Sequence, residues 1–357
     1  MITEPACHLT LCVINYNGEH YLKESLESVF VQKQKFEEIL LIDNASKDGS
    51  LEIVRNKFPT IRIIQLDKNL GPAVARNVGF KMASCVRILF MDNDVSLAPN
   101  CPDQLMQALN DNPFAVVAMP CVLYSHNKNT IQYDGADSHF LGLMMLHNVN
   151  RPLIISDGMR KIGSVVTACF LMDRSRWKGD VPFDDTFFFN YEDHDFGLRT
   201  RILGHEILSV PSALCYHREG TKGLSLREGG SYSKMRVFCL IRNRWQLILK
   251  NYEFKTLLLL SPVFFIYEIF QIVGVIKKRW FVEWGKAFFW IVLHPLEILR
   301  KRQIIQEARK TPDREVLRDG PIPFREGDLI KSSLERVGKN ILNFLIKAYW
   351  KRIERFI

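Results

Sequence analysis

Short apolar stretches alternate with helical patterns over roughly the first quarter of the chain. The apolar stretches, each with the length of a buried strand, occupy residues 9–14, 39–42, 61–65 and 86–91. Between them, apolar residues recur at helical spacing, as Leu22, Leu26 and Val29 do. Strands and helices that alternate in this way form a mainly parallel sheet with helices on both faces. The pattern therefore predicts an α/β fold.

Clusters of Asp and Asn follow three of these strands. They occupy residues 15–17, 43–48 and 92–94. Open parallel sheets bind ligands beyond the carboxyl ends of their strands, so three such clusters predict a nucleotide-sized site. Neither GxGxxG nor GxxxxGK[ST] follows the first strand, which argues against a dinucleotide-binding fold and a P-loop.

The carboxylates of these clusters have two interpretations each. Asp92 and Asp94 stand two residues apart just past a strand, a pattern that suits Mg²⁺ or Mn²⁺ and equally suits a turn. Asp43 ends the second strand, where a carboxylate binds a ribose or a base, or caps the next helix. Ser46 and Asp48 can supply that cap, so we favour a ligand role for Asp43.

The segment 187–199 is the richest in aromatic and charged residues. It predicts a helix that begins near Glu192. On this helix Asp195 and Arg199 are four residues apart and can form a structural ion pair on the face that also holds Glu192. Asp193 lies about a hundred degrees away. It is the candidate general base, with a pKa that the preceding aromatic residues would raise.

His217 follows a predicted strand at 207–210 and a bend at Pro211. A lone histidine is more often structural than functional. Together with Asp92 and Asp94, however, a neutral imidazole becomes a candidate metal ligand.

The basic charge of the chain is concentrated in its last third. Residues 1–240 contain 25 Lys and Arg against 27 Asp and Glu, a net charge of −2, whereas residues 241–357 contain 23 against 12, a net charge of +11. Such asymmetry indicates a nucleic acid or a membrane surface as partner. The last third also carries stripes of apolar residues, which are unsuited to binding nucleic acid. Because the sequence contains no nucleic-acid-binding motif either, we exclude nucleic acid as a partner.

The last third contains apolar helical patterns bordered by basic residues. Residues 257–276 hold only one charge, Glu268, and are long enough to cross a bilayer. The cluster 277–279 (Lys-Lys-Arg) would then lie outside, against the positive-inside tendency, so we expect an interfacial, re-entrant or hairpin segment. Residues 281–302, with a kink at Pro295, and 331–357 show apolar stripes typical of helices on an anionic membrane, although core-packing or dimer helices remain open.

The eight cysteines show no CxxC and no paired spacing, so we expect reduced thiols and no metal or disulfide framework. The N-terminus is too polar for a signal peptide, which predicts a cytosolic protein.

Six motifs lie in sequence between about residues 10 and 220. They are Val13-Ile-Asn-Tyr-Asn17, Ile42-Asp-Asn-Ala-Ser-Lys-Asp-Gly-Ser50, Asn69-Leu-Gly-Pro-Ala-Val-Ala-Arg-Asn77, Met91-Asp-Asn-Asp94, Tyr191-Glu-Asp-His-Asp-Phe-Gly-Leu-Arg199 and Tyr216-His-Arg-Glu-Gly220. In kind and in order, these motifs resemble those of the family 2 inverting glycosyltransferases of the GT-A fold, and in particular rhamnosyltransferase-type enzymes of bacterial surface polysaccharides.

The resemblance implies a role for each matching residue. Donor-binding residues would be Asn15, Asp43, Asn44, Arg76, Asn77, Asp92 and Asn93. A divalent metal, Mg²⁺ or Mn²⁺, would be bound by Asp92, Asp94 and His217, with Asp94 the most direct ligand. Asp193 would be the base that deprotonates the acceptor, supported by Glu192, Asp195 and Arg199.

The resemblance also implies an organisation and a place of work. Residues 1–240 would be the catalytic domain, with a donor half to about residue 100 and an acceptor half from 101, and residues 241–357 a membrane-associated region. The enzyme would move a sugar, such as rhamnose from dTDP-rhamnose or a sugar from a UDP-sugar, to a lipid-linked or polysaccharide acceptor. It would work at the cytoplasmic face of a bacterial inner membrane, as a monomer or a homo-oligomer.

Processive synthases of the family carry Gln-x-x-Arg-Trp, whereas Ile241 replaces the Gln here, which predicts a single-addition enzyme. The alternative is a catalytically silent, membrane-associated binding protein. A nucleotidyltransferase is disfavoured because the glycine-rich phosphate loop is absent.

Overall fold

The computed structural model describes residues 8–154, 158–218, 232–322 and 333–357. Residues 219 and 220 of the last motif, and the side chain of Leu334 in the predicted stripe, lie outside this description. The chain divides into two compact units. The sheet unit comprises residues 1–136, 146–200 and 205–225, and the helical unit comprises residues 137–145, 201–204 and 226–357.

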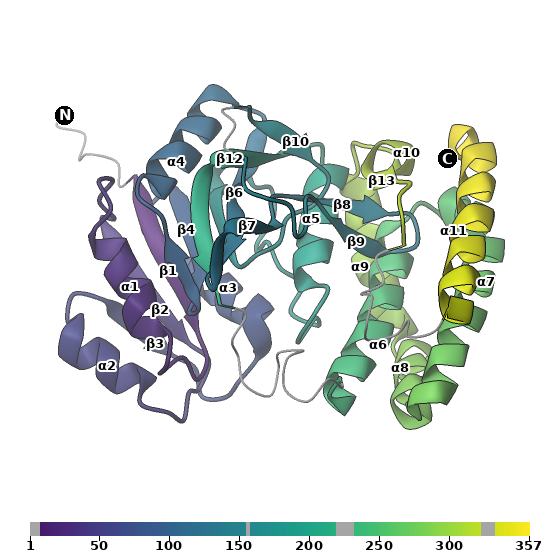
Figure 1. The fold of residues 1–357 in the computed structure, drawn as a ribbon, viewed down its shortest axis with the longest axis horizontal. Coiled ribbons are helices and arrows are strands. Elements are labelled where there is room, and N and C mark those ends of the chain that lie inside the picture. Colours follow the sequence, from purple (N-terminus) through teal and green to yellow (C-terminus); the bar gives the residue numbers. More distant parts are fainter. Residues whose placement is uncertain (1–7, 155–157, 219–231, 323–332) are drawn as a thin grey trace. The chain divides into compact units, whose positions relative to one another are not determined.

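A ten-stranded sheet forms the core of the sheet unit within the described residues (Figure 1). The first strands run parallel, as predicted, and the structure places them in the order β3-β2-β1-β4. Their bounds are β1 (Leu9–Asn15), β2 (Glu38–Asp43), β3 (Arg62–Gln65) and β4 (Arg87–Asp92). Every residue of β1 is buried, because this strand lies between two neighbours and under helices on both faces.

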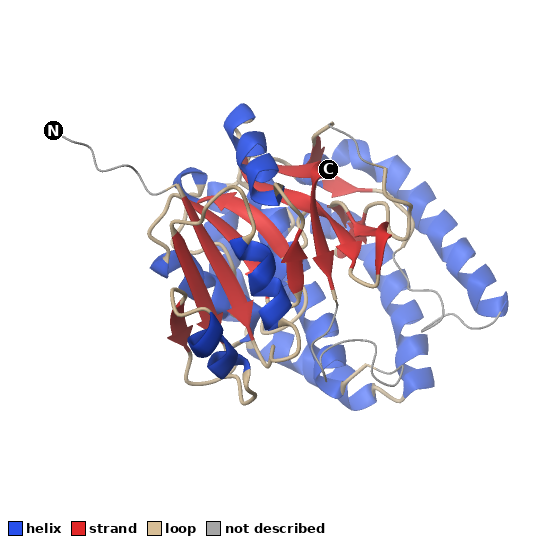
Figure 2. Ribbon diagram, turned by 60° about the vertical axis from the view of Figure 1, so that its left-hand side comes forward, coloured by secondary structure: helices blue, strands red, loops and turns tan. Residues whose placement is uncertain are grey.

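Later segments of the chain extend the sheet beyond β4. Antiparallel β11 (Cys169–Asp173) joins β4 to β6 (Ala115–Tyr124), and β12 (Glu206–His217) follows parallel to β6. The remaining strands are β5 (Val95–Leu97) and β10 (Arg160–Ile162), both paired with β12, and β7 (Asn127–Tyr133), paired with β6. Figure 2 shows the twist of this sheet, with its strands in red.

Helices of the sheet unit connect the parallel strands. They are α1 (Leu22–Phe30), α2 (Ser50–Lys57), α3 (Gly71–Met82), α4 (Cys101–Asp111) and α5 (Glu192–Ile202). The order β3-β2-β1-β4 and right-handed crossovers put α1 and α2 on one face and α3 on the other. Accordingly, α1 packs against α2, and α3 packs against β1 and β2.

Two expectations change in detail. The predicted bend at Pro211 is a shift in the pairing of β12 with β6 between Val210 and Leu214, so one strand continues through the proline. Six cysteines are buried free thiols, namely Cys12, Cys101, Cys121, Cys169, Cys215 and Cys239. Cys85, by contrast, is disulfide-bonded, so the expectation that every cysteine is a reduced thiol is wrong at this position.

The helical unit contains the predicted C-terminal helices. They are α6 (Lys234–Asn251), α7 (Phe254–Lys278), α8 (Phe281–Leu293), α9 (Pro295–Ala308), α10 (Asp313–Val316) and α11 (Ser333–Ile353). The predicted kink at Pro295 is the break between α8 and α9. A small sheet of order β13-β8-β9 completes the described elements, with β8 (Ala136–His139), β9 (Leu143–Leu146) and β13 (Leu317–Arg318).

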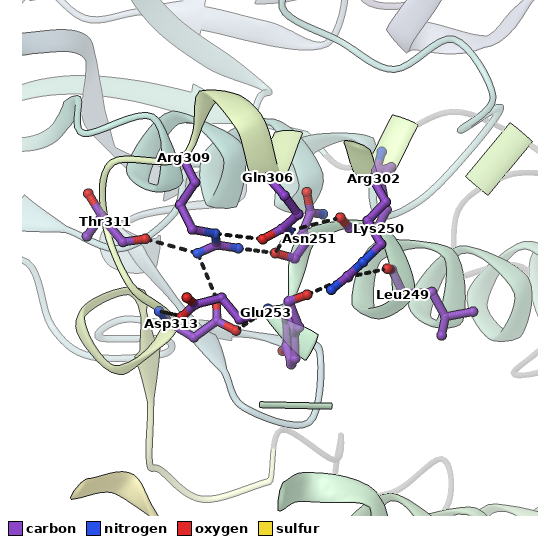
Figure 3. A network of polar contacts seen from close by, with 10 residues as sticks. Leu249, Lys250, Asn251, Glu253, Arg302, Gln306, Arg309, Thr311 and Asp313 are labelled. Atoms are coloured by element: carbon purple, nitrogen blue, oxygen red, sulfur yellow. Dashed lines mark hydrogen bonds and ion pairs between the residues drawn. The ribbon is translucent and has the colours of Figure 1, made fainter. Parts of the chain in front are cut away.

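Arg302 of α9 and Arg309, the residue that follows α9, donate to the last carbonyls of α6 (Figure 3). Arg302 Nη1 donates to the Leu249 carbonyl at 2.8 Å, and Arg309 Nη2 donates to the Asn251 carbonyl. Arg309 Nη1 also donates to Asp313 Oδ1 at 2.9 Å. These carbonyls have no partner within their helix, and cations are favourable at a helix C-terminus. The network therefore fixes α9 against the end of α6.

Candidate active site

Asn15 connects the three polar clusters predicted at the strand ends. Its Nδ2 donates to Asp43 Oδ1 at 2.8 Å, and its Oδ1 accepts from Asn93 Nδ2 at 2.8 Å. Asn15 is fully buried, because β1 lies between β2 and β4. A Cβ atom on Gly18 would lie 2.4 Å from both Asn15 Oδ1 and Asn93 Nδ2, so only glycine fits beside this pair. Hydrogen bonds to the Asn15 side chain thus join the three clusters.

The side chains after β2 hold the neighbouring loops. Asp43 is fully buried and accepts from the Ser46 N–H at 3.0 Å and the Ser46 hydroxyl at 2.5 Å. Asn44 Oδ1 accepts from the Leu70 N–H at 2.8 Å and so attaches the end of β2 to the start of α3. Both side chains bind protein groups in this structure. Their contact with a nucleotide base remains a prediction.

Arg76 of α3 lies between two carboxylates from distant parts of the chain. Its guanidinium is buried, donates to Asp92 Oδ1 at 2.7 Å, and has Nη1 3.8 Å from Glu192 Oε1. Arg76 also donates to the Thr167 carbonyl at 3.1 Å. Burial raises the pKa of Asp92, and the Arg76 charge opposes this rise. Arg76 therefore brings the end of β4 and the start of α5 to one place.

The next residue of α3 has a different partner. Asn77 Nδ2 donates to the Phe183 carbonyl at 2.8 Å, and Asn77 Oδ1 accepts from the Phe183 N–H at 3.0 Å. This side chain is buried and binds one residue's backbone through both of its polar atoms. In the structure Asn77 holds the segment that leads to α5, and its predicted support of the donor is untested.

Asp94 and His217 face each other across the sheet edge. The register of β5 and β12 pairs Val95 with His217, which brings His217 Nε2 to 3.4 Å from Asp94 Oδ1. The opposite ring nitrogen, Nδ1, lies 2.9 Å from Gln132 Oε1. Because an amide oxygen only accepts, Nδ1 carries a proton and donates it to Gln132. In the neutral ring, Nε2 then presents a lone pair on the side of Asp94.

Asp94 and His217 provide part of a binding site for a divalent cation. Mg²⁺ and Mn²⁺ commonly use one or two carboxylates together with substrate phosphates, and a second hydrogen-bond acceptor normally orients a ligating imidazole. Asp94, His217 and Gln132 supply those protein parts. Within the described residues, no three His, Cys, Asp or Glu side chains converge on one metal-sized position, and Asp92 is engaged by Arg76. The remaining coordination positions would belong to phosphate and water.

The helix α5 begins where the chain makes a tight turn. Asn190 and Tyr191 precede it with φ values of 60° and 71°, a left-handed conformation that is uncommon for tyrosine. On the helix, Arg199 Nε donates to Asp195 Oδ2 at 2.7 Å, which confirms the predicted i, i+4 pair. Arg199 also donates to the Pro182 carbonyl at 2.5 Å. These two residues therefore anchor α5 and leave its first turn at the site.

Asp193 and Glu192 occupy that first turn, and the pKa of each carboxyl is raised. Burial raises the pKa of Asp193 from 3.8 to about 6, although the His194 N–H at 2.7 Å and the charge of Arg76 oppose the rise. Burial and the neighbouring Asp193 charge raise the pKa of Glu192 from 4.5 to about 8. The Asp193 carboxylate is thus more basic than that of an ordinary aspartate. A raised basicity is what a general base needs.

Sequence patterns did not identify Gln132. It lies on β7, which pairs with β6, and β6 in turn pairs with the strand of His217. No local motif marks such a contact, because it depends on the pairing of three strands. Ser46 was considered only as a helix cap, and its hydrogen bonds to Asp43 were not anticipated.

The sheet order, with the polar clusters at the carboxyl ends of β1, β2 and β4, defines a GT-A-like α/β fold. Residues 10–176 match the family model described as Glycosyl transferase family 2. The fold is shared with the crystal structure of GalNAc-T7 with UDP, GalNAc and Mn²⁺. The TM-score is 0.55 at 14% identity, over 71% of this chain and 49% of that one.

Two relatives illustrate the sequence similarity. An uncharacterized glycosyltransferase of Haemophilus influenzae is 37% identical over 98 residues, which is 27% of this chain and 38% of that protein. The N-acetylglucosaminyl-diphospho-decaprenol L-rhamnosyltransferase of Mycobacterium tuberculosis is 25% identical over 233 residues, or 59% of this chain and 76% of that protein. The chain thus spans less than half the length of the H. influenzae protein and of GalNAc-T7.

Proposed function

We propose that the protein is an inverting glycosyltransferase that moves a sugar from a nucleoside diphosphate sugar to a lipid-linked or polysaccharide acceptor. The observation that carries this proposal is the position of Arg76. Its guanidinium bridges Asp92 of the donor-side cluster and Glu192, the neighbour of Asp193. A carboxylate with a raised pKa therefore lies beside the residues expected to hold a diphosphate, as a single displacement requires.

Asp193 is the base of this reaction. The acceptor hydroxyl attacks the anomeric carbon while its proton passes to Asp193, and the bond from the anomeric carbon to the diphosphate oxygen breaks. The configuration inverts because the attacking and leaving oxygens lie on opposite sides of that carbon. Burial and the neighbouring Asp193 charge raise the pKa of Glu192, which favours its neutral form beside Asp193.

On the donor side, Asp94 and His217 would hold Mg²⁺ or Mn²⁺, and Asp92 would contact the ribose or the metal. A divalent cation at this position supplies positive charge to the departing nucleoside diphosphate. The crystal structure of GalNAc-T7 contains Mn²⁺ together with UDP, which is consistent with this assignment. Asn15, Asp43, Asn44, Arg76, Asn77 and Asn93 would form or support the nucleotide pocket.

The proposed acceptor and the proposed location at a membrane are supported by the relatives and by the basic C-terminal third of the chain. The M. tuberculosis relative acts, by its name, on a lipid diphosphate and transfers L-rhamnose. A lipid-linked acceptor agrees with this name. A dTDP- or UDP-linked donor and work at the cytoplasmic face of a membrane are further parts of the proposal. Ile241, in place of the Gln of processive synthases, favours single addition.

A donor screen tests the proposal. The full chain is incubated with Mn²⁺ and UDP-, dTDP- or GDP-sugars, and thermal shift, donor hydrolysis and transfer to membrane-lipid extracts are measured. We expect one nucleotide to raise the melting temperature and one sugar to be released or transferred. Donor binding with neither hydrolysis nor transfer would support the alternative, a silent binding protein.

A further inference from the structure

Helices of the helical unit expose rows of large apolar side chains. Five residues on one face of α7 are each at least half exposed: Leu258, Phe265, Ile269, Val273 and Ile276. α8 and α11 also expose large apolar residues, at Val282, Phe289, Val292, Val337, Ile341, Phe344 and Leu345. α7 packs against both of these helices. A concentration of exposed apolar side chains of this kind marks an interaction surface.

The opposite face of α7 is buried inside the helical unit. Leu260, Val263, Phe264 and Tyr267 are almost inaccessible. Phe264 packs edge-on against the Trp245 ring of α6, with ring centroids 5.7 Å apart. The helix therefore has one face that is covered by protein and one that is not. The sequence alone does not show this difference, because both faces are apolar.

A buried ion pair fixes α7 to α6 in the middle of its apolar run. Glu268 Oε1 lies 2.5 Å from Arg244 Nη1, and Arg244 Nε donates to the Leu141 carbonyl at 2.8 Å. The Arg244 guanidinium also lies over the Tyr267 ring, 4.5 Å from its centroid. The ion pair marks the face of α7 that is packed against α6, away from the exposed apolar side chains.

Basic residues border the exposed face. Lys277 and Lys278 end α7, and Arg279 follows with a φ of 57°, a left-handed residue that ends the helix and leads into α8. These three positive charges adjoin Val273 and Ile276. Apolar side chains flanked by lysine and arginine match the chemistry of an anionic bilayer, in which acyl chains lie beneath negatively charged headgroups.

We infer that the exposed faces of α7, α8 and α11 dock on an anionic lipid bilayer, and that α7 inserts into one leaflet without crossing. This inference deepens the membrane part of the proposed function and also rests on it. Its tests measure lipid binding and topology without sugar transfer, so either proposal can fail while the other stands.

The first test is vesicle flotation of the full-length protein. The double variant Phe265→Ser/Val273→Ser should lose about tenfold in partitioning to vesicles of phosphatidylglycerol and phosphatidylcholine, because two apolar side chains no longer enter the lipid. Phe114→Ser is the matched control, since Phe114 is 75% exposed but belongs to the sheet unit. Equal binding by the double variant and the control would overturn the inference. Circular dichroism confirms that both variants fold.

A second test separates an interfacial α7 from a spanning one. Lys255→Cys and Arg279→Cys place thiols at the two ends of the helix and are treated with a membrane-impermeant maleimide in inside-out membrane vesicles. Both should react before detergent is added. A position that reacts only after detergent would show that α7 crosses the membrane and would overturn the inference.

A third measurement tests whether a second copy of the chain, instead of lipid, binds this surface. Sedimentation of the lipid-free protein and of Phe265→Ser/Val273→Ser should give the same oligomeric state. A dimer that the double substitution dissociates, with unchanged vesicle binding, would assign the surface to a second copy and overturn the lipid assignment.

Discussion

Gln132 Oε1 accepts a hydrogen bond from Nδ1 of His217 at 2.9 Å, on the side of the ring away from Asp94. The bond selects one tautomer, in which Nε2 would be the nitrogen that binds the proposed metal. Gln132 is thus a positioning residue, although nothing in the sequence around it indicates such a role. An acceptor of this kind typically contributes tenfold or more to metal affinity.

Replacing Gln132 with Leu should weaken Mn²⁺ binding by about tenfold, because the His217 ring loses the acceptor that orients it. Electron paramagnetic resonance of free Mn²⁺ measures this without turnover. Gln104→Ala is the matched control, since Gln104 accepts from Ser212 on an exposed surface. Unchanged Mn²⁺ affinity in the Leu variant would show that the bond has only a structural role.

Replacing Asp193 with Asn should reduce transfer by about a hundredfold or more and leave donor binding nearly intact, since the amide cannot accept the proton. The wild-type rate should rise with pH through about 6, because Asp193 acts only when ionised and burial raises its pKa to that value. Initial rates at fixed saturating donor measure the profile. A variant that retains turnover would exclude Asp193 as the base.

Replacing Glu192 with Gln should stabilise the protein more at high pH than at low pH. The folded-state pKa of Glu192, about 8, exceeds its ordinary 4.5. Glu192 therefore contributes its full stabilisation to the folded state below about pH 4.5. This stabilisation is lost as the pH rises through about 8. Gln does not ionise and avoids this loss. Thermal unfolding of both proteins at about pH 5 and about pH 8 should show a growing advantage for the variant, and a constant difference would contradict the raised pKa.

Replacing Gly18 with Ala should destabilise the protein by about 1–3 kcal/mol, because the added methyl group forces apart Asn15 and Asn93. Gly274→Ala is the control: Gly274 lies inside α7, near its C-terminal end, and nothing lies within 4 Å of its Cβ position, so the change should stabilise by about 0.5–1 kcal/mol. Chemical denaturation measures both. Equal effects at the two positions would contradict the close contact at Gly18.

Local patterns predicted the parts of the structure that depend on local spacing. The strand ends at Asn15, Asp43 and Asp92 followed from apolar runs of strand length, and the Asp195–Arg199 pair followed from helical geometry. Each depends on residues close in sequence or on the common edge of a parallel sheet.

The contacts that escaped prediction join distant segments. Arg76 meets Glu192 only because α3 and α5 converge on one edge of the sheet, and Gln132 meets His217 through two strand pairings. The exposed and covered faces of α7 were likewise unpredictable, since both are apolar and only packing distinguishes them. Tertiary arrangement, which no single-sequence pattern records, decides each of these cases.

The hydrogen bonds of Asn15 have a consequence for protein engineering. One buried amide joins the loops after β1, β2 and β4, so none of these loops can be exchanged alone without leaving a polar atom of Asn15 or its partners unsatisfied. A change of donor preference by grafting loops from a relative would have to transfer all three together. These loops therefore have to be exchanged together. Point substitutions that retain Asn15, Gly18 and Asn93 are the safer route to altered specificity.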